Sequence, residues 1–251
     1  MTGFEFPGEY YEIIRSDFRD LDAETTFLAS YLPADGRVLD VGCGTGTNLR
    51  ALAERGFAGV GVDASACFID YAKNAASTGD TEYVHSDAAD YVPRQRFDLV
   101  VSLFGSLNYV ARDRLRSVLT MIADSLEPDG HAVIEVAQLL NAVEVFQPTM
   151  VQHHRAEGLL ITRTSRQAVV PHMASWINDE CITVRTADGA VQLFDNRATQ
   201  AIITTPELVD LLQVHGLEVV SRFGGFRQEP APPHGRGPLV LVARRAGQTS
   251  S

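Results

Sequence analysis

Apolar residues recur along the first half of the chain in two alternating patterns, one typical of amphipathic helices and one typical of buried strands. Pro128-Asp129-Gly130 is predicted to form a turn before the last of these strands. Alternating strands and helices indicate a parallel, doubly wound α/β sheet with helices on both faces. Helices are predicted over about 20–32, 48–55, 65–76 and 112–126, and strands over 37–41, 59–63, 82–85, 97–104 and 131–137.

The pattern changes after about residue 140. Consecutive strands without helices between them indicate an antiparallel insertion, with strands predicted over 159–170, 173–185 and 191–203. A helix from Thr205 and two antiparallel strands over 217–223 and 238–244 then complete the sheet. We therefore predict an α/β fold with a doubly wound, mostly parallel seven-stranded sheet and a small antiparallel β insertion after strand five. The expected α/β domain covers 1–138 and 204–246, and the insertion covers 139–203.

Charge narrows the classes of ligand. The 251 residues include 21 Lys and Arg but 32 Asp and Glu, which gives a net charge of −11. Nucleic acids and anionic membranes both need a basic face, so neither is an expected partner. No apolar run approaches the roughly 20 residues of a membrane span, and the N-terminal stretch lacks the basic and apolar regions of a secretory signal.

The three cysteines also indicate a soluble protein of a reducing compartment. Cys43, Cys67 and Cys181 are scattered along the chain and form neither a disulfide framework nor a thiolate metal site. We expect a reduced, soluble, cytoplasmic protein without a bound metal, acting on a small-molecule partner. The exposed face of the antiparallel insertion is a candidate surface for a homodimer.

The strongest chemical signal is the segment from Asp40 to Gly46, DVGCGTG, which joins a buried strand to a helix. Its glycines allow a ligand to approach the backbone, and the helix N-terminus favours a phosphate or a carboxylate. Asp63 follows the next strand, 21 residues after Gly42, where an acidic group accepts both hydroxyls of a ribose. Dinucleotide enzymes prefer the spacing G-x-G-x-x-G, whereas this chain has D-x-G-x-G-x-G.

This spacing resembles the nucleotide-binding loop of class I S-adenosylmethionine-dependent methyltransferases. Asp87-Ala88 resembles the acidic position that reads the adenine amino group, and FDLVVSLFGSLNYV and LEPDGHAVIEV resemble the fourth and fifth strands of that family. The resemblance covers most of residues 20–140 and implies that the cofactor is S-adenosyl-L-methionine. The cofactor-binding residues expected from it and from their placement are Tyr11, Arg15, Asp40, Gly42, Cys43, Gly44, Asp63, Ala64, Asp87, Ala88, Leu103 and Phe104.

Other segments resemble the antibiotic amino-sugar N,N-dimethyltransferases. These are Glu9-Tyr10-Tyr11, similar to their tyrosine-bearing lid, the segment VVSLFGSLNYV, the three-stranded insertion and the two closing strands. The resemblance implies methylation of the amine of a nucleotide-linked amino sugar in natural-product biosynthesis, by in-line displacement without a metal. Alternatives are an O-, carboxyl- or glycine-type N-methyltransferase for another small metabolite, and a non-catalytic protein that binds S-adenosylmethionine or a dinucleotide.

Candidate catalytic and acceptor residues follow from their placement. Tyr11 either closes over the cofactor or packs as an aromatic residue of a terminal helix. The adjacent His153 and His154 are the candidate bases, and their side chains point in different directions, so they are not expected to bind one metal. Glu135 either holds the acceptor or has a structural role. The expected substrate-binding residues are Phe104, Asn108, Tyr109, Glu135, Gln138, Trp176, Asn178 and Arg236.

Overall fold

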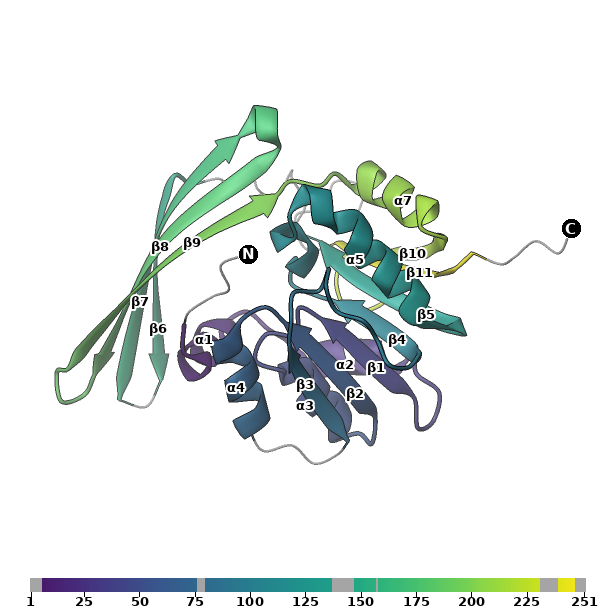
Figure 1. Ribbon diagram of the computed structural model, residues 1–251. Coiled ribbons are helices and arrows are strands. Elements are labelled where there is room, and N and C mark those ends of the chain that lie inside the picture. Colours follow the sequence, from purple (N-terminus) through teal and green to yellow (C-terminus); the bar gives the residue numbers. More distant parts are fainter. Residues whose placement is uncertain (1–5, 76–79, 137–146, 157, 231–238, 247–251) are drawn as a thin grey trace, which may run out of the picture.

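The computed structural model describes residues 6–75, 80–136, 147–156, 158–230 and 239–246. It contains a seven-stranded sheet with helices on both faces and a separate four-stranded antiparallel sheet that stands beside it (Figure 1). Among the described residues, no helix has the length and apolar character needed to cross a bilayer.

The seven-stranded sheet has the strand order β10-β11-β5-β4-β1-β2-β3. The strands β1 to β5 pair with one another in parallel, whereas β11 pairs antiparallel with both β5 and β10. This confirms the predicted doubly wound, mostly parallel sheet. The strands are β1 (Arg37–Val41), β2 (Ala58–Asp63), β3 (Thr81–His85), β4 (Phe97–Ser102), β5 (Leu126–Val136), β10 (Leu217–Phe223) and β11 (Leu239–Arg245).

The predicted turn at Pro128-Asp129-Gly130 is wrong, because β5 runs through it from Leu126 to Val136. The register between β4 and β5 shifts between Phe97 and Leu99, opposite this segment. A Cβ on Gly130 would lie 3.0 Å from the Phe97 carbonyl oxygen, so the glycine lets the irregular segment stay close to β4. The residues typical of a turn therefore form an irregularity within a strand.

Helices cover the two faces of the large sheet in separate layers. On one face α5 (Arg112–Ser125) and α7 (Thr205–Val214) pack against apolar side chains of β1, β2, β5 and β11. On the other face α2 (Leu21–Ala29), α3 (Thr47–Ala53) and α4 (Ala66–Asn74) pack against the alternate residues of the strands. Leu39 faces the first layer and Val38 the second, and both are fully buried. Burial on both sides explains the continuous apolar runs of the strands.

The second sheet has the order β6-β7-β8-β9 and is antiparallel throughout. Its strands are β6 (Thr149–Ala156), β7 (Leu159–Val170), β8 (Ser175–Thr186) and β9 (Val191–Ala201). The last three confirm the predicted strands, and the short 3-10 helix η2 (Pro171–Met173) joins β7 to β8. Strand β6 was not predicted, although it pairs with β7 over its whole length.

Helix α1 (Gly8–Ser16), near the N-terminus, packs between the two sheets (Figure 1). Ile14 packs in an apolar cluster with Ile161, Ile182 and Val184 of the four-stranded sheet. On its other side, Glu12 accepts hydrogen bonds from the hydroxyls of Thr45 and Thr47, the latter at 2.7 Å, beside the glycine-rich loop. The helix therefore borders the space between the sheets.

Candidate functional site

A cavity of about 810 Å³ lies between the two sheets, at the carboxyl ends of β1, β2 and β4. Residues of the glycine-rich loop, of α1 and of the 3-10 helix η1 (Ser106–Tyr109) line it together with residues of β7, β8 and β9. Ligands of open α/β sheets bind at this end of the strands. The cavity is therefore the candidate site, and the four-stranded sheet supplies one of its sides.

The three glycines of the loop have different reasons to be glycine. Gly42, Gly44 and Gly46 all have positive φ angles, of 80°, 55° and 77°. A Cβ on Gly42 would lie 2.6 Å from the Ser106 side chain, and one on Gly46 would lie 2.5 Å from the Tyr83 ring. A Cβ on Gly44 would meet nothing closer than the Tyr11 ring at 4.0 Å. Packing within the protein thus requires the outer glycines, whereas Gly44 faces the cavity.

Asp63 lies at the end of β2 and ties the glycine-rich loop to the start of α4. Its Oδ2 accepts the Gly44 N–H at 2.8 Å and its Oδ1 accepts the Ser65 N–H at 2.8 Å. Burial raises the pKa of this carboxyl, and the same two N–H groups act in the opposite direction. A carboxylate has about four acceptor positions, so Asp63, which lines the cavity, retains capacity for two hydroxyl donors.

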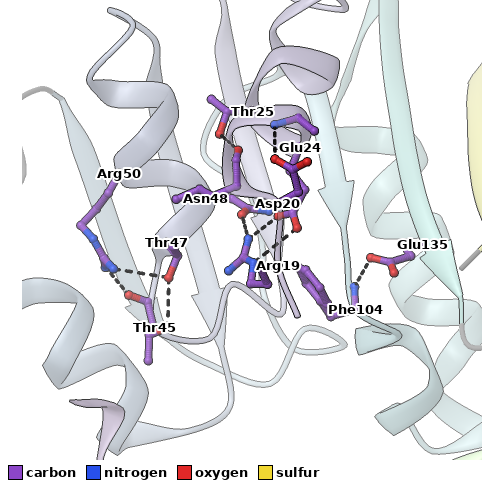
Figure 2. A network of polar contacts seen from close by, with 12 residues as sticks. Arg19, Asp20, Glu24, Thr25, Thr45, Thr47, Asn48, Arg50, Phe104 and Glu135 are labelled. Carbon is purple, nitrogen blue, oxygen red and sulfur yellow. Dashed lines mark hydrogen bonds and ion pairs between the residues drawn. The ribbon is translucent and has the colours of Figure 1, made fainter. Parts of the chain in front are cut away.

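Two guanidinium groups and a buried carboxylate lie together at one end of the cavity. Arg15 and Arg19 lie over the Phe104 ring, with guanidinium carbons 3.6 and 4.5 Å from its centroid. Glu24 and Asn48 hold Arg19 in place (Figure 2). The Arg15 Nε is buried and has no hydrogen-bond partner among the described residues.

The buried carboxylate at this end is Asp40, which is 3% exposed. Burial and, to a smaller extent, the Asp63 charge raise its pKa, Arg19 lowers it, and the net result is a pKa of about 7. A ligand that carries both an ammonium and a carboxylate complements Asp40 and the two arginines. Arg15 was predicted from the sequence, whereas Arg19, four residues later and before α2, was not.

The other predicted cofactor residues divide into two groups. Tyr11, Cys43, Ala64, Ala88, Leu103 and Phe104 line the cavity. Asp87 is not among its lining residues, because its carboxylate accepts the Ala89 N–H at 2.9 Å and pairs with Arg114 at 3.1 Å. Burial raises the pKa of the Cys43 thiol well above its usual value, so this cysteine is an unreactive packing residue of the loop.

Phe104 occupies an unusual backbone position. Its φ of 54° is left-handed, as is that of Gly105, which is 67°. The buried Glu135 of β5 accepts the Phe104 N–H at 2.8 Å (Figure 2). Glu135 does not line the cavity, so its position favours the structural role over direct acceptor binding.

The remaining predicted acceptor residues are dispersed. Tyr109 lines the cavity, and burial raises its pKa to about 12, so its phenol is neutral at physiological pH. The Asn108 side chain donates to the carbonyl of Ala201, a lining residue, at 2.9 Å, but Asn108 itself does not line the cavity. Trp176 and Asn178 of β8 are also not among the lining residues. Gln138 and Arg236 lie outside the described residues.

The two histidines do not lie where a base is needed. His153 is exposed, with its Nδ1 3.1 Å from the Thr162 hydroxyl, and His154 is buried with its Nδ1 on the Asp17 carboxylate. Neither lines the cavity. Both belong to β6, the strand at the edge of the second sheet, and neighbouring residues of a strand point to opposite faces. We therefore assign no catalytic role to either histidine, which corrects the prediction.

Sequence reasoning missed a group of polar residues on the cavity side of the second sheet. Arg163, Glu180 and Asn196 line the cavity from β7, β8 and β9. The available signal was the two-residue period of the strands, which puts Glu180 on the same face as Ile182 and Val184. Across the described residues, no group of three or more His, Cys, Asp or Glu side chains is arranged to hold a metal ion.

Comparisons with known proteins point to one type of chemistry. Residues 38–130 match the protein family described as "Methyltransferase domain". The cypemycin N-terminal methyltransferase of a Streptomyces species is 28% identical over 245 residues, which cover 94% of this chain and 95% of that protein. The dTDP-3-amino-3,6-dideoxy-α-D-glucopyranose N,N-dimethyltransferase of Streptomyces fradiae is 30% identical over 133 residues, which cover 51% of each chain.

Solved structures agree with the fold over nearly the whole chain. DesVI from Streptomyces venezuelae superposes with a TM-score of 0.77 at 24% identity, covering 94% of this chain and 97% of that one. The amino pentose methyltransferase CalS10 from Micromonospora echinaspora, solved with S-adenosylmethionine bound, gives a TM-score of 0.72 at 22% identity and covers 98% and 99%. The second sheet is thus part of the fold shared with these structures.

Proposed function

Since the chain is an S-adenosylmethionine-dependent methyltransferase with the class I fold, we propose that it methylates the amine of a nucleotide-linked amino sugar in natural-product biosynthesis. The observation that carries this proposal is a cavity bounded on one side by the glycine-rich loop and on another by polar residues of the four-stranded sheet. Similarity to the amino-sugar dimethyltransferase of Streptomyces fradiae supports the choice of acceptor.

The chain's residues fit the cofactor. S-adenosylmethionine supplies a methyl group that is already activated by its sulfonium. Asp63 is proposed to accept the ribose hydroxyls and Asp40 the ammonium group. Arg15 and Arg19 are proposed to bind the carboxylate, which would give the buried Arg15 Nε a partner. The adenine is proposed to lie near Ala88, and its recognition by Asp87 stays a prediction.

The chain's main task in the proposed reaction is alignment. A neutral amine reacts without a base, so the protein must hold the nucleophile in line and exclude water. Tyr11 packs on Phe68 with ring centroids 4.5 Å apart, and both residues border the cavity beside Gly44. Phe104 is proposed as the wall beside the reacting methyl, and the neutral Tyr109 as a hydrogen-bonding partner of the acceptor. No metal is part of this proposal.

A second acceptor is favoured by a different observation. One relative that matches nearly the full length of the chain is the cypemycin N-terminal methyltransferase. The N-terminal amine of a peptide is therefore the alternative acceptor. Both acceptors present an amine, so the alignment described for Tyr11, Phe104 and Tyr109 applies to either. O-methylation, carboxyl methylation and methylation of glycine are the further outcomes to be tested.

The test is a methylation assay with deuterated S-adenosylmethionine and mass spectrometry. The acceptors are dTDP-3-amino-3,6-dideoxy-α-D-glucopyranose, a peptide with a free N-terminus, glycine, a phenol and a carboxylic acid. We expect label in the amino sugar and none in its N-acetylated form, which is the matched control. Label in the peptide alone would select the second acceptor, and label in none of them would contradict the proposed function.

Alanine substitutions at two of the glycines should separate cofactor binding from folding. Gly44→Ala introduces left-handed strain of about 1–2 kcal/mol but no close contact, so the variant should fold and bind S-adenosylhomocysteine at least tenfold more weakly. Gly46→Ala adds a clash with Tyr83 to the same strain and should cost roughly a further 1–3 kcal/mol of stability. Thermal unfolding and calorimetry measure the two effects. Unchanged binding by Gly44→Ala would contradict the assignment of the cavity.

A further inference from the structure

We propose that Glu180, positioned by Asn178, binds a hydrogen-bond donor of the acceptor and determines which amine is presented for methylation. This inference rests on the proposed function, because it concerns the acceptor end of the same cavity. It gives a binding role to the second sheet, whose polar residues lie opposite the glycine-rich loop. The argument begins with the register of the strands.

Strand register puts Glu180 in the middle of a polar row. Ser165 of β7 pairs with Glu180 of β8, which pairs with Asn196 of β9. Residues directly opposite each other in an antiparallel sheet point to the same face. Glu180 and Asn196 line the cavity, so the row crosses the cavity face of the sheet. The next row includes the apolar Ile182 and Phe194, so Glu180 is a carboxylate at the border of an apolar cluster.

The two oxygens of the Glu180 carboxylate accept different numbers of hydrogen bonds. The Glu180 side chain is 2% exposed, and a carboxylate buried to that extent requires several donors. Its Oε1 accepts from Arg163, from Asn178 at 2.6 Å and from Ser165 at 3.4 Å. Its Oε2 accepts from Asn196 alone among the described residues, at 3.2 Å. Oε2 therefore has room for another donor.

The side-chain oxygen of Asn178, next to Glu180, lacks a hydrogen-bond partner among the described residues. The Asn178 amide must turn its Nδ2 toward Glu180, because an ionised carboxylate only accepts hydrogen bonds. Its Oδ1 is then buried and has no hydrogen-bond partner within the part of the chain that the structure describes. Such an unsatisfied oxygen costs about 1–3 kcal/mol. Asn178 does not line the cavity, so its role is to position Glu180. The N–H of a neutral amine would supply the donor that Glu180 Oε2 can still accept.

The charge of the site favours anchoring over proton removal. Arg163 is ion-paired with Glu180 and also lines the cavity, so the carboxylate is held in a fixed orientation. Tyr109 is close enough for the charges of Glu180 and Arg163 to influence its pKa. The acceptor is then held between the second sheet and η1, facing the glycine-rich loop. Anionic and apolar groups would leave Glu180 Oε2 without a further donor, so the site selects for acceptors that present an amine N–H or a hydroxyl.

Glu180→Gln tests the inference, because it keeps the shape and replaces one acceptor oxygen by a donor. With dTDP-3-amino-3,6-dideoxy-α-D-glucopyranose we expect KM to rise at least tenfold, while affinity for S-adenosylhomocysteine stays within about twofold. The matched control is Asp195→Asn, a carboxylate-to-amide change at an exposed residue of β9 that does not line the cavity. The control should match the wild type in KM, kcat and melting temperature.

Discrimination between ligands separates binding from a structural role. We expect the wild type to bind the amino sugar more tightly than the nucleotide sugar with a hydrogen in place of the amine, and Glu180→Gln to lose most of this preference. If Glu180→Gln does not fold, Asn178→Ala is measured in the same way and should also raise KM. A folded variant with unchanged KM and preference overturns the inference while leaving the proposed function intact. A wild type that binds S-adenosylhomocysteine but neither binds nor methylates the amino sugar overturns both.

Discussion

Asp40→Asn should stabilise the ligand-free protein at pH 8.5 by up to about 4 kcal/mol. Asp40 is 3% exposed, and burial raises its pKa from the ordinary 3.8 to about 7. The fold thus prefers the protonated carboxyl. This contribution to stability is complete below about pH 4 and is lost as the pH rises through 7. The difference between 3.8 and about 7 corresponds to about 4 kcal/mol, and asparagine avoids this loss because it does not ionise.

The measurement is the free energy of urea unfolding of wild type and Asp40→Asn, without ligand, at pH 5 and pH 8.5. Glu135, another buried carboxyl with a raised pKa, affects both proteins equally and cancels in the difference. Asp63 interacts electrostatically with Asp40, so its part in the pH dependence is included in the effect of the substitution. We expect the stability advantage of the variant to be much larger at the higher pH. An advantage that does not change with pH would show that Asp40 is not the group that titrates.

The same substitution should weaken ligand binding. A bound ammonium favours the charged form of Asp40, so binding to the wild type releases a proton near and below pH 7. Affinity for S-adenosylhomocysteine should therefore fall as the pH drops from 8 to 6, by at most tenfold for each pH unit. Asp40→Asn should bind more weakly at pH 8 and show little of this pH dependence. Calorimetry at both pH values measures the effect, and an equal slope in the two proteins would contradict it.

Asp63→Ala should weaken S-adenosylhomocysteine binding by roughly 2–4 kcal/mol, which is about 30- to 1,000-fold. The substitution removes the proposed acceptor of both ribose hydroxyls. It also removes the partner of the Gly44 N–H, so part of the loss reflects a less ordered loop. Asp63→Asn keeps one acceptor oxygen and should lose less.

Asp87→Ala is the comparison for this measurement. The Asp87 carboxylate already has partners in Ala89 and Arg114, so its removal should affect binding less than removal of the Asp63 carboxylate. Calorimetric titration of the variants gives the order directly. An affinity of Asp63→Ala within about threefold of the wild type would mean that the ribose does not bind there.

Local patterns in the sequence were sufficient to predict most strands of the seven-stranded sheet. The segment from Asp40 to Gly46 combines a buried strand, a turn and a helix start within a few residues, and its conformation depends little on distant parts of the chain. Strand β6 was missed for the opposite reason. Its sequence TMVQHHRA has weak alternation, and pairing with β7 makes it a strand. The residues 128–130 were misread because Gly130 serves a close approach between strands rather than a turn.

In the candidate site, too, residues placed by local sequence were predicted and residues placed by distant packing were not. Asp63 was identified because its position relative to the glycines is fixed within one β-α-β unit. Glu180 was missed, since a glutamate in an alternating strand is usually exposed, and only the packing of the second sheet against the cavity buries it. His153 and His154 were predicted to be bases from their residue type alone. Their strand lies at the edge of the sheet, which the sequence does not encode locally.

The left-handed backbone of Phe104 has a consequence for directed evolution toward larger acceptors. A library at this position is filtered by conformation as well as by volume, because the residue borders the cavity at a φ of 54° and its N–H is fixed by Glu135. Glycine and asparagine adopt this conformation readily, whereas valine and isoleucine are strongly disfavoured in it. Useful broad-range catalysts should therefore be sought among Phe104→Gly and Phe104→Asn, and β-branched replacements should be lost through poor folding before their selectivity is assayed.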